Sequence, residues 1–154
     1  MAVSVKKVTL WHKETADVPG TLAATLEPLA NAGADLQIVI GRGAAIAPAS
    51  MQAEIAVHPI SGRKATGAAQ QAGLSAWSIP TLLVEGDNRP GLGHAIARAL
   101  GDAGINLAYV MALVMGRRYS ALFGFENAAD AGRASALIKK ASAPPPKKAA
   151  TRRR

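Results

Sequence analysis

A sequence motif that occurs twice constrains the fold of this chain more than any other feature. The first copy reads Asp17-Val18-Pro19-Gly20-Thr21-Leu22, and the second reads Asn88-Arg89-Pro90-Gly91-Leu92-Gly93, 71 positions later. The two copies can be matched without a gap as far as Met51 and Leu122. An internal period indicates a repeated structural unit. The sequence therefore predicts two similar units of about 70 residues.

The composition indicates a packed core built largely from small side chains. Hydrophobic residues make up 49% of the 154 residues, but aromatic residues make up only 4%. Units of about 70 residues bury a low fraction of their surface and are marginal alone. We therefore expect the two units to pack against each other or against a second chain. The predicted boundaries are residues 1–78 for the first unit, 79–140 for the second, and 141–154 for a disordered basic tail rich in Pro, Lys and Arg.

The net charge of +8 belongs mostly to the C-terminal end. Seven of the 18 basic residues follow residue 138, where there is no acidic residue, so the body holds eleven basic and ten acidic residues. A near-neutral body does not indicate a nucleic-acid-binding fold. The tail resembles solvated basic segments that contact nucleic acid non-specifically. The alternative is a tail that only aids solubility.

Several functional classes find no support in the sequence. There is no cysteine and no apolar stretch long enough for a signal peptide or a membrane span, so we expect a cytoplasmic protein without membrane contact. His12, His58 and His94 lack the spacing of metal ligands. Gly41-Arg42-Gly43 lacks the lysine of a phosphate-binding loop and is interpreted as a hairpin connection. No catalytic set is evident, so we predict neither an enzyme nor a metal or cofactor site.

Hydrophobic spacing and the positions of Gly and Pro predict the order of helices and strands. The first unit is expected to run strand, helix, strand, strand, helix, strand, and the second to lack the last strand. Pro28 conflicts with the first helix, because proline removes a backbone donor. Asn127 is expected to cap the last helix. The predicted strands are Val8–Trp11, Asp35–Ile40, Met51–Val57, Leu74–Glu85 (shared by both units), Ile105–Val114 and Tyr119–Phe125, and the predicted helices are Gly20–Ala32, Ser61–Ala72, Leu92–Leu100 and Ala128–Lys140.

This order is typical of the ferredoxin-like α+β class, with helices on one face of an antiparallel sheet. The segment Leu107–Val114 departs from the alternation that a half-covered sheet should show, because both of its faces are apolar. Something must therefore cover the face away from the helices. We favour a homodimer, and the alternatives are a strand of the other unit or a long loop.

The repeated motifs resemble the ACT domain family. In each copy, Pro-Gly before a helix is followed by Ala-Gly and a strand, and the second copy, with Asn88–Leu92 and Ala103–Leu107, is the closer match. The resemblance covers both units and leaves out only the tail. It implies two ferredoxin-like βαββαβ units that pair side by side, often into an eight-stranded sheet, and bind small effectors, usually amino acids, at the unit interface. With no catalytic domain present, it implies a free-standing, non-catalytic regulatory protein.

The repeated loop has chemistry suited to a small zwitterion. A helix N-terminus presents unpaired N–H groups and a partial positive charge, and a carboxylate suits that place. Gly91 permits close approach to its backbone, and the Asn106 amide can both donate and accept. The predicted ligand-binding residues are Asn88, Arg89, Pro90, Gly91, Leu92, His94, Ile105 and Asn106 in the second copy, and Asp17, Val18, Pro19, Gly20 and Asp35 in the first.

The two copies are expected to differ in what they bind. The first has Asp17 and Asp35 where the second has Asn88 and Asn106. Carboxylates would repel a ligand carboxylate and favour an ammonium or guanidinium group, so the second copy is the better carboxylate site. The alternative is structural: Pro-Gly only shapes the turn, and Asp17 or Asn88 only caps the helix, which is worth about 1 kcal/mol. Two further hypotheses are a ligand-free interaction module that uses the apolar strand and a nucleic-acid-associated protein that acts through its tail.

Overall fold

The computed structural model describes residues 3–45 and 52–145, and it divides the chain into two compact units. One unit, which we call the first unit, is Thr9–Ser78. The other is formed by the chain before Thr9 together with the chain after Ser78. Within the described part of the chain, no helix is both long and apolar enough to cross a membrane.

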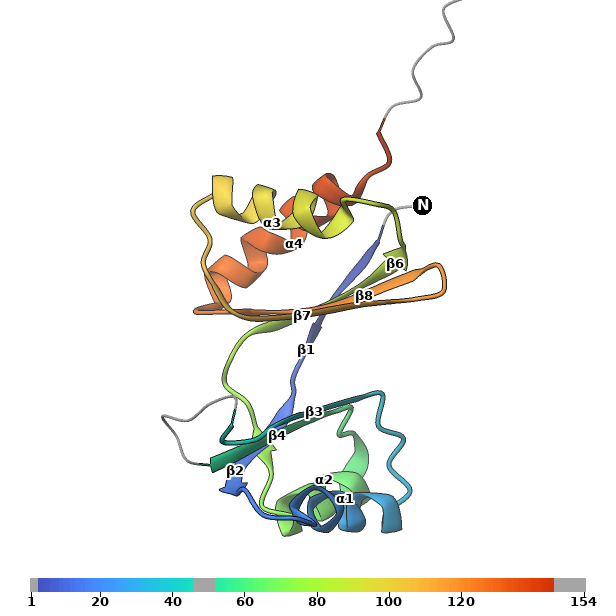
Figure 1. Ribbon diagram of the computed structural model, residues 1–154, viewed down its shortest axis with the longest axis vertical. Coiled ribbons are helices and arrows are strands. Elements are labelled where there is room, and N and C mark those ends of the chain that lie inside the picture. Colours follow the sequence, from blue (N-terminus) through green and yellow to red (C-terminus); the bar gives the residue numbers. More distant parts are fainter. Residues whose placement is uncertain (1–2, 46–51, 146–154) are drawn as a thin grey trace, which may run out of the picture. The chain divides into compact units, whose positions relative to one another are not determined.

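The Thr9–Ser78 unit is one antiparallel sheet with two helices on the same face (Figure 1). Its strand order is β3-β4-β2-β5. Leu29, Val57 and Ala69 are fully buried in its core. The elements are β2 (Trp11–Ala16), α1 (Thr21–Asn31), β3 (Ile38–Arg42), β4 (Gln52–His58), α2 (Gly62–Gln71) and β5 (Ser75–Ala76).

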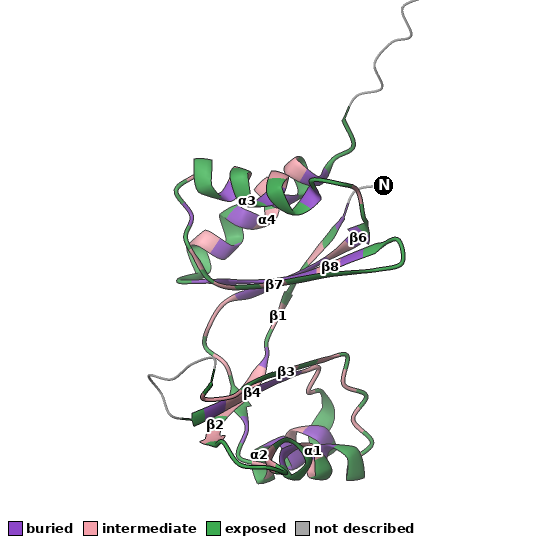
Figure 2. Ribbon diagram, in the orientation of Figure 1, coloured by how far each residue is buried: buried purple, intermediate pink, exposed green. Residues whose placement is uncertain are grey.

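The other unit, which we call the second unit, has the strand order β1-β6-β8-β7. Its buried residues concentrate on β6, on β8 and on the helix sides that face the sheet (Figure 2). Ile96, Phe125 and Ile138 are fully buried there. The elements are β1 (Ser4–Val8), β6 (Thr81–Asp87), α3 (Leu92–Asp102), β7 (Leu107–Met115), β8 (Arg118–Phe125) and α4 (Ala128–Ser142).

Both units have the ferredoxin-like topology, which confirms the predicted α+β class. In each sheet the first strand lies between the third and the fourth, and the second strand lies at an edge. The first strands are β2 and β6, and the second strands are β3 and β7. The fourth strand is β5 in the first unit and β1 in the second.

The N-terminal strand corrects two sequence predictions. The second unit does not lack its last strand, because β1 pairs antiparallel with β6, with Ser4 opposite Glu85 and Val8 opposite Thr81. The predicted single strand Val8–Trp11 is wrong, because the chain leaves one sheet after Val8 and enters the other at Trp11. Residues before Thr9 therefore lie in the second unit rather than, as the predicted boundaries had it, in the first.

The side chains around β1 explain why it pairs there. Val3 is buried in the core of the second unit, and Val5 packs against it. Gly86 on β6 allows the close approach, because a Cβ at that position would lie 2.8 Å from Cγ1 and 2.9 Å from Cα of Val3. Lys6 and Lys7 remain exposed on this edge strand, as is common where a sheet edge must stay unpaired.

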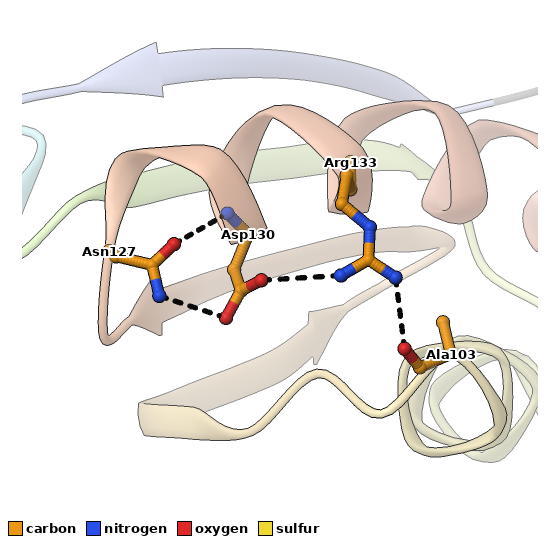
Figure 3. Close-up of polar contacts among 4 residues, drawn as sticks. All are labelled: Ala103, Asn127, Asp130 and Arg133. Atoms are coloured by element: carbon orange, nitrogen blue, oxygen red, sulfur yellow. Dashed lines mark hydrogen bonds and ion pairs between the residues drawn. The ribbon is translucent and has the colours of Figure 1, made fainter.

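A series of polar contacts stabilises the start of helix α4 (Figure 3). Asn127 is the N-cap, and its Oδ1 accepts a hydrogen bond of 2.8 Å from the Asp130 backbone N–H, which confirms the predicted cap. Arg133, one turn later, contacts Asp130 and donates to the carbonyl oxygen of Ala103 at 3.0 Å. Because Ala103 is the C-cap of α3, these contacts connect the end of α3 to the start of α4.

The strand pairing corrects the gapless match between the two copies. Thr15 on β2 and Gly86 on β6 are 71 positions apart, and they lie opposite Ala53 and Tyr119, respectively. Ala53 and Tyr119 are only 66 positions apart. The two copies are therefore equivalent as far as Arg42, and the longer connection between β3 and β4 then shifts the register by five residues.

We predict that Gly86→Ala destabilises the protein by about 1–3 kcal/mol, the usual cost of forcing an atom into a packed core. The added methyl group would meet the backbone of Val3 and push β1 from β6. Chemical denaturation measures the effect. Gly132→Ala is the control, because nothing lies within 4 Å of the added Cβ in α4, and it should stabilise by about 0.5–1 kcal/mol. Equal stabilities for the two variants would contradict the tight β1–β6 contact.

Candidate functional site

The repeated Pro-Gly motif forms a type II turn that leads into a helix in both units. Gly20 has φ 87° and ψ −6°, and Gly91 has φ 82° and ψ 0°, which are the values of the third residue of that turn. The Thr21 N–H donates to the Val18 carbonyl at 3.3 Å, and the Leu92 N–H donates to the Arg89 carbonyl at 3.1 Å. Glycine is required there because other residues rarely adopt a positive φ.

The turn also decides the question of helix capping. Gly20 and Gly91 are themselves the N-caps of α1 and α3, and neither helix has a side-chain cap. The predicted alternative in which Asp17 or Asn88 caps the helix is therefore wrong, whereas the turn-shaping part of it is confirmed. With no side-chain cap, first-turn N–H groups that the helix cannot pair internally stay available.

A pocket of about 310 Å³ lies beside the first of these turns. It is bounded by the turn and first turn of α1 on one side and by the ends of β3 and β4 on the other. On the strand side, Ala53 contributes only a methyl group to the lining. The lining residues that matter for its chemistry are Asp17, Thr21, Leu22, Arg42, Ala53 and Glu54.

Charged groups of both signs line this pocket. Arg42 Nη2 donates to Glu54 Oε2 at 2.6 Å, although an ion pair as exposed as this one adds only about 0–1 kcal/mol to stability. The Asp17 Oδ2 accepts a hydrogen bond of 2.8 Å from the Ala44 N–H, which holds the β3–β4 connection against the turn. Asp17, Glu54 and Arg42 leave the pocket with one excess negative charge.

The second turn is surrounded by bonds that the protein makes to itself. The Asn88 N–H donates to the Arg117 carbonyl at 2.8 Å. Arg89 Nη2 donates to the carbonyl of Ala141 in the last turn of α4 at 3.1 Å, and its buried Nε has no partner. A cation at a helix C-terminus is favourable. Arg89, which we expected to attract a ligand carboxylate, is thus engaged with α4.

The remaining predicted residues lie in several places. Asn106 donates to Glu126 Oε1 at 2.8 Å on the surface. Asp35 lines a different pocket of about 370 Å³, together with Arg63 and Lys64, away from the Val18–Thr21 turn. Leu92 and Ile105 are buried in the core, whereas Pro90 and His94 are exposed. The structure therefore brings Asp17, Val18 and Gly20 together at one pocket, and it separates Asp35 from them.

The sequence analysis missed the strand side of the first pocket. Arg42, Ala53 and Glu54 come from β3 and β4, and no local motif marks them. Gly41–Gly43 was interpreted only as a hairpin connection. The pairing of Arg42 with Glu54 across β3 and β4 was the one available signal, since opposite charges on facing strands attract.

Two tyrosines have perturbed acidity. Burial raises the pKa of Tyr109 above its ordinary value of 10.0, and the hydrogen bond with Thr81 partly opposes this. Burial also raises the pKa of Tyr119, whose position on β8 corresponds to that of Ala53 on β4. Among residues 3–45 and 52–145, no cluster of His, Cys, Asp and Glu could hold a metal ion.

Solved structures with the same fold include regulatory proteins. Protein BT0572 from Bacteroides thetaiotaomicron has a TM-score of 0.67 at 15% identity, over 88% of this chain and 98% of that one. Aspartokinase alpha and beta subunits have a TM-score of 0.61 at 15% identity, over 92% of this chain and 97% of that one. The ligand-free regulatory subunit of aspartate kinase from Thermus thermophilus has the same TM-score and coverage at 19% identity.

These likenesses confirm the resemblance that the motifs predicted: the chain has the ACT-like fold, in two ferredoxin-like units. At such identities the likeness concerns the fold alone, because one fold supports many functions. No protein-family model and no curated protein matches the sequence.

We predict that neither tyrosine titrates with an ordinary pKa in the folded protein, because burial disfavours the phenolate. Absorbance of tyrosinate measures this, and the chain unfolded in guanidinium, with both pKa values near about 10, is the control. Since the folded pKa values are raised, their contribution to stability is complete below the unfolded pKa and is lost as pH rises through the folded values. A tyrosine with an ordinary pKa in the folded state would contradict the described burial.

Proposed function

We propose that this chain is a non-catalytic regulatory protein whose first unit binds a free amino acid in the pocket beside the Val18–Thr21 turn. The observation that carries the proposal is the pocket itself, which joins an uncapped helix N-terminus to charged groups of both signs. The fold shared with the regulatory subunit of aspartate kinase supports a regulatory role.

A zwitterion matches the groups of this pocket. Its carboxylate would accept hydrogen bonds from the free N–H groups of the first turn of α1, where the helix dipole also favours negative charge. Its ammonium would lie against Asp17, because a carboxylate that already accepts one N–H keeps further lone pairs. Leu22, which is 44% exposed, and the buried Ala53 and Ile55 would contact its apolar atoms.

The charge of the pocket favours cationic over acidic amino acids. Arg42 is already paired with Glu54, so its charge is largely balanced. Asp17 then supplies the net negative charge, and an acidic side chain would be repelled. This preference agrees with the expectation that the acidic copy of the motif takes a cationic group.

A binding experiment follows from this assignment. We expect titration calorimetry to detect binding of one or more basic amino acids, with acidic ones bound more weakly. Asp17→Asn should weaken binding about tenfold to a hundredfold, the worth of a hydrogen bond to a charged group. Asp35→Asn is the matched control, because Asp35 lines a different pocket, and it should leave the affinity unchanged.

The second motif provides the contrary outcome. If Asn106→Ala abolishes binding while Asp17→Asn does not, the effector site lies in the second unit as the sequence favoured. If no common amino acid gives a binding signal in calorimetry or a change in Tm, the effector hypothesis is wrong. The ligand-free interaction module is then the better-supported hypothesis.

We also propose that the protein forms a homodimer through β7. This strand is an edge of its sheet, it has no charged residue among its nine, and it leaves Val110, Leu113, Val114 and Met115 exposed, Met115 at 72%. An uncharged edge of this length is a template for pairing with another chain. The other described edges are less suited, since β1 carries two lysines, β5 has two residues and β3 ends in Gly41-Arg42.

The dimer can be tested with variants at equivalent positions. Val110→Lys should raise the dimer dissociation constant by at least about tenfold, because a buried unpaired charge costs more than about 1.4 kcal/mol. Val39→Lys is the control, because Val39 occupies the same place on β3 and is exposed to a similar degree. Analytical ultracentrifugation measures both. A monomeric wild-type protein, or dissociation only by Val39→Lys, would contradict the assignment.

The predicted contact of the tail with nucleic acid stays a prediction. Helix α4 continues to Ser142, past the predicted start of the tail. Residues 146–154, which hold all five basic residues of the predicted tail, lie outside the described part of the chain.

A further inference from the structure

Tyr119 and Ala53 occupy the same place in the two units. Ala53 lies opposite Thr15 on the neighbouring strand, and Tyr119 lies opposite Gly86. The residue that follows each of them along its strand is also equivalent. Glu54 lies opposite Arg42 on the edge strand β3, and Ser120 lies opposite Leu113 on the edge strand β7. The repeat therefore places alanine in one unit where it places tyrosine in the other.

This exchange falls on the strand side of the proposed effector pocket. In the first unit, Ala53 and Leu22 both line the open space of about 310 Å³. In the second unit, Tyr119 is only 5% exposed. Its hydroxyl lies 3.8 Å from the position that a Cβ on Gly93 would take, and Gly93 corresponds to Leu22. The phenol ring thus reaches from β8 to the first turn of α3, across the space that the first unit leaves empty.

The neighbouring positions change in the same sense. Thr21, whose side chain is half-buried at the pocket, corresponds to Leu92, which is 2% exposed in the core. Gly41 corresponds to Ala112, and Arg42 and Glu54 correspond to Leu113 and Ser120. The second unit therefore has a buried tyrosine and uncharged residues at the positions where the first has an alanine and a charged pair.

We propose that Tyr119 permanently fills the second unit's copy of the effector pocket, so that each chain binds a single effector, in the first unit. The part of this inference that concerns effector number rests on the proposed function. The filled pocket itself does not, and it can be tested without any amino acid. Tyr119 acts here as an internal ligand: it supplies to α3 the packing that an effector would supply to α1.

The first arm of the test uses cavity rescue by phenol. Removal of a buried ring leaves a cavity that a small aromatic molecule can occupy. Tyr119→Val should have a lower Tm than wild type, and phenol should raise its Tm in a concentration-dependent manner, as expected for a ligand of the folded state alone. Tyr119→Phe is the matched control, because it keeps the ring and therefore has no cavity at position 119. Any rise in its Tm with phenol would report phenol bound elsewhere, for example in the first-unit pocket. Tyr119→Thr, also β-branched and suited to a strand, replaces Tyr119→Val if that variant does not fold.

The second arm measures stoichiometry by calorimetry with the amino acid that wild type binds. Wild type should bind one equivalent per chain, and Ala53→Tyr, which installs the ring in the first unit, should lose binding while it remains folded. Two equivalents per chain in wild type, or no greater phenol rescue of Tyr119→Val than of Tyr119→Phe, would overturn the inference. Absence of amino-acid binding together with specific phenol rescue would overturn the proposed function and leave the filled pocket supported.

Discussion

The antiparallel pairing of β1 with β6 is the interaction on which the architecture depends. It completes the second sheet with a segment that precedes the whole of the first unit, so the first unit is inserted between two parts of the second. The chain crosses between the units twice, at Thr9–Leu10 and at Trp77–Pro80.

The two copies of the motif share one backbone design but face different side chains. Both type II turns have almost the same dihedral angles, and both end in a helix without a side-chain cap. The difference lies in the side chains on the opposing strand, where a methyl group in one unit is replaced by a phenol ring in the other. On our proposal a duplicated turn does not give duplicated binding, because Tyr119 occupies the place that Ala53 has beside the other turn.

Local patterns predicted much of the fold, because helices, turns and caps are determined within a few residues. The Asn127 cap, the Gly-stopped helices and the two-unit repeat all followed from such patterns. The place of β1 did not, since its pairing with β6 joins residues as far apart as Ser4 and Glu85. The pocket was missed for a related reason: the equivalence of Ala53 and Tyr119 is hidden by five extra residues in the connection between β3 and β4, and only the strand pairing reveals it.

The position of β1 also has a consequence for biosynthesis. On the ribosome this strand is made before the first unit, whereas its partner β6 emerges only after that unit is complete. The sheet of the first unit uses only strands made between these two, whereas the sheet of the second unit needs β1 together with strands made after the first unit. Native contacts of such long sequence separation slow folding. Lys6 and Lys7 are exposed on β1. Before β6 has been made, their charges would disfavour pairing of β1 with the same strand of a neighbouring nascent chain.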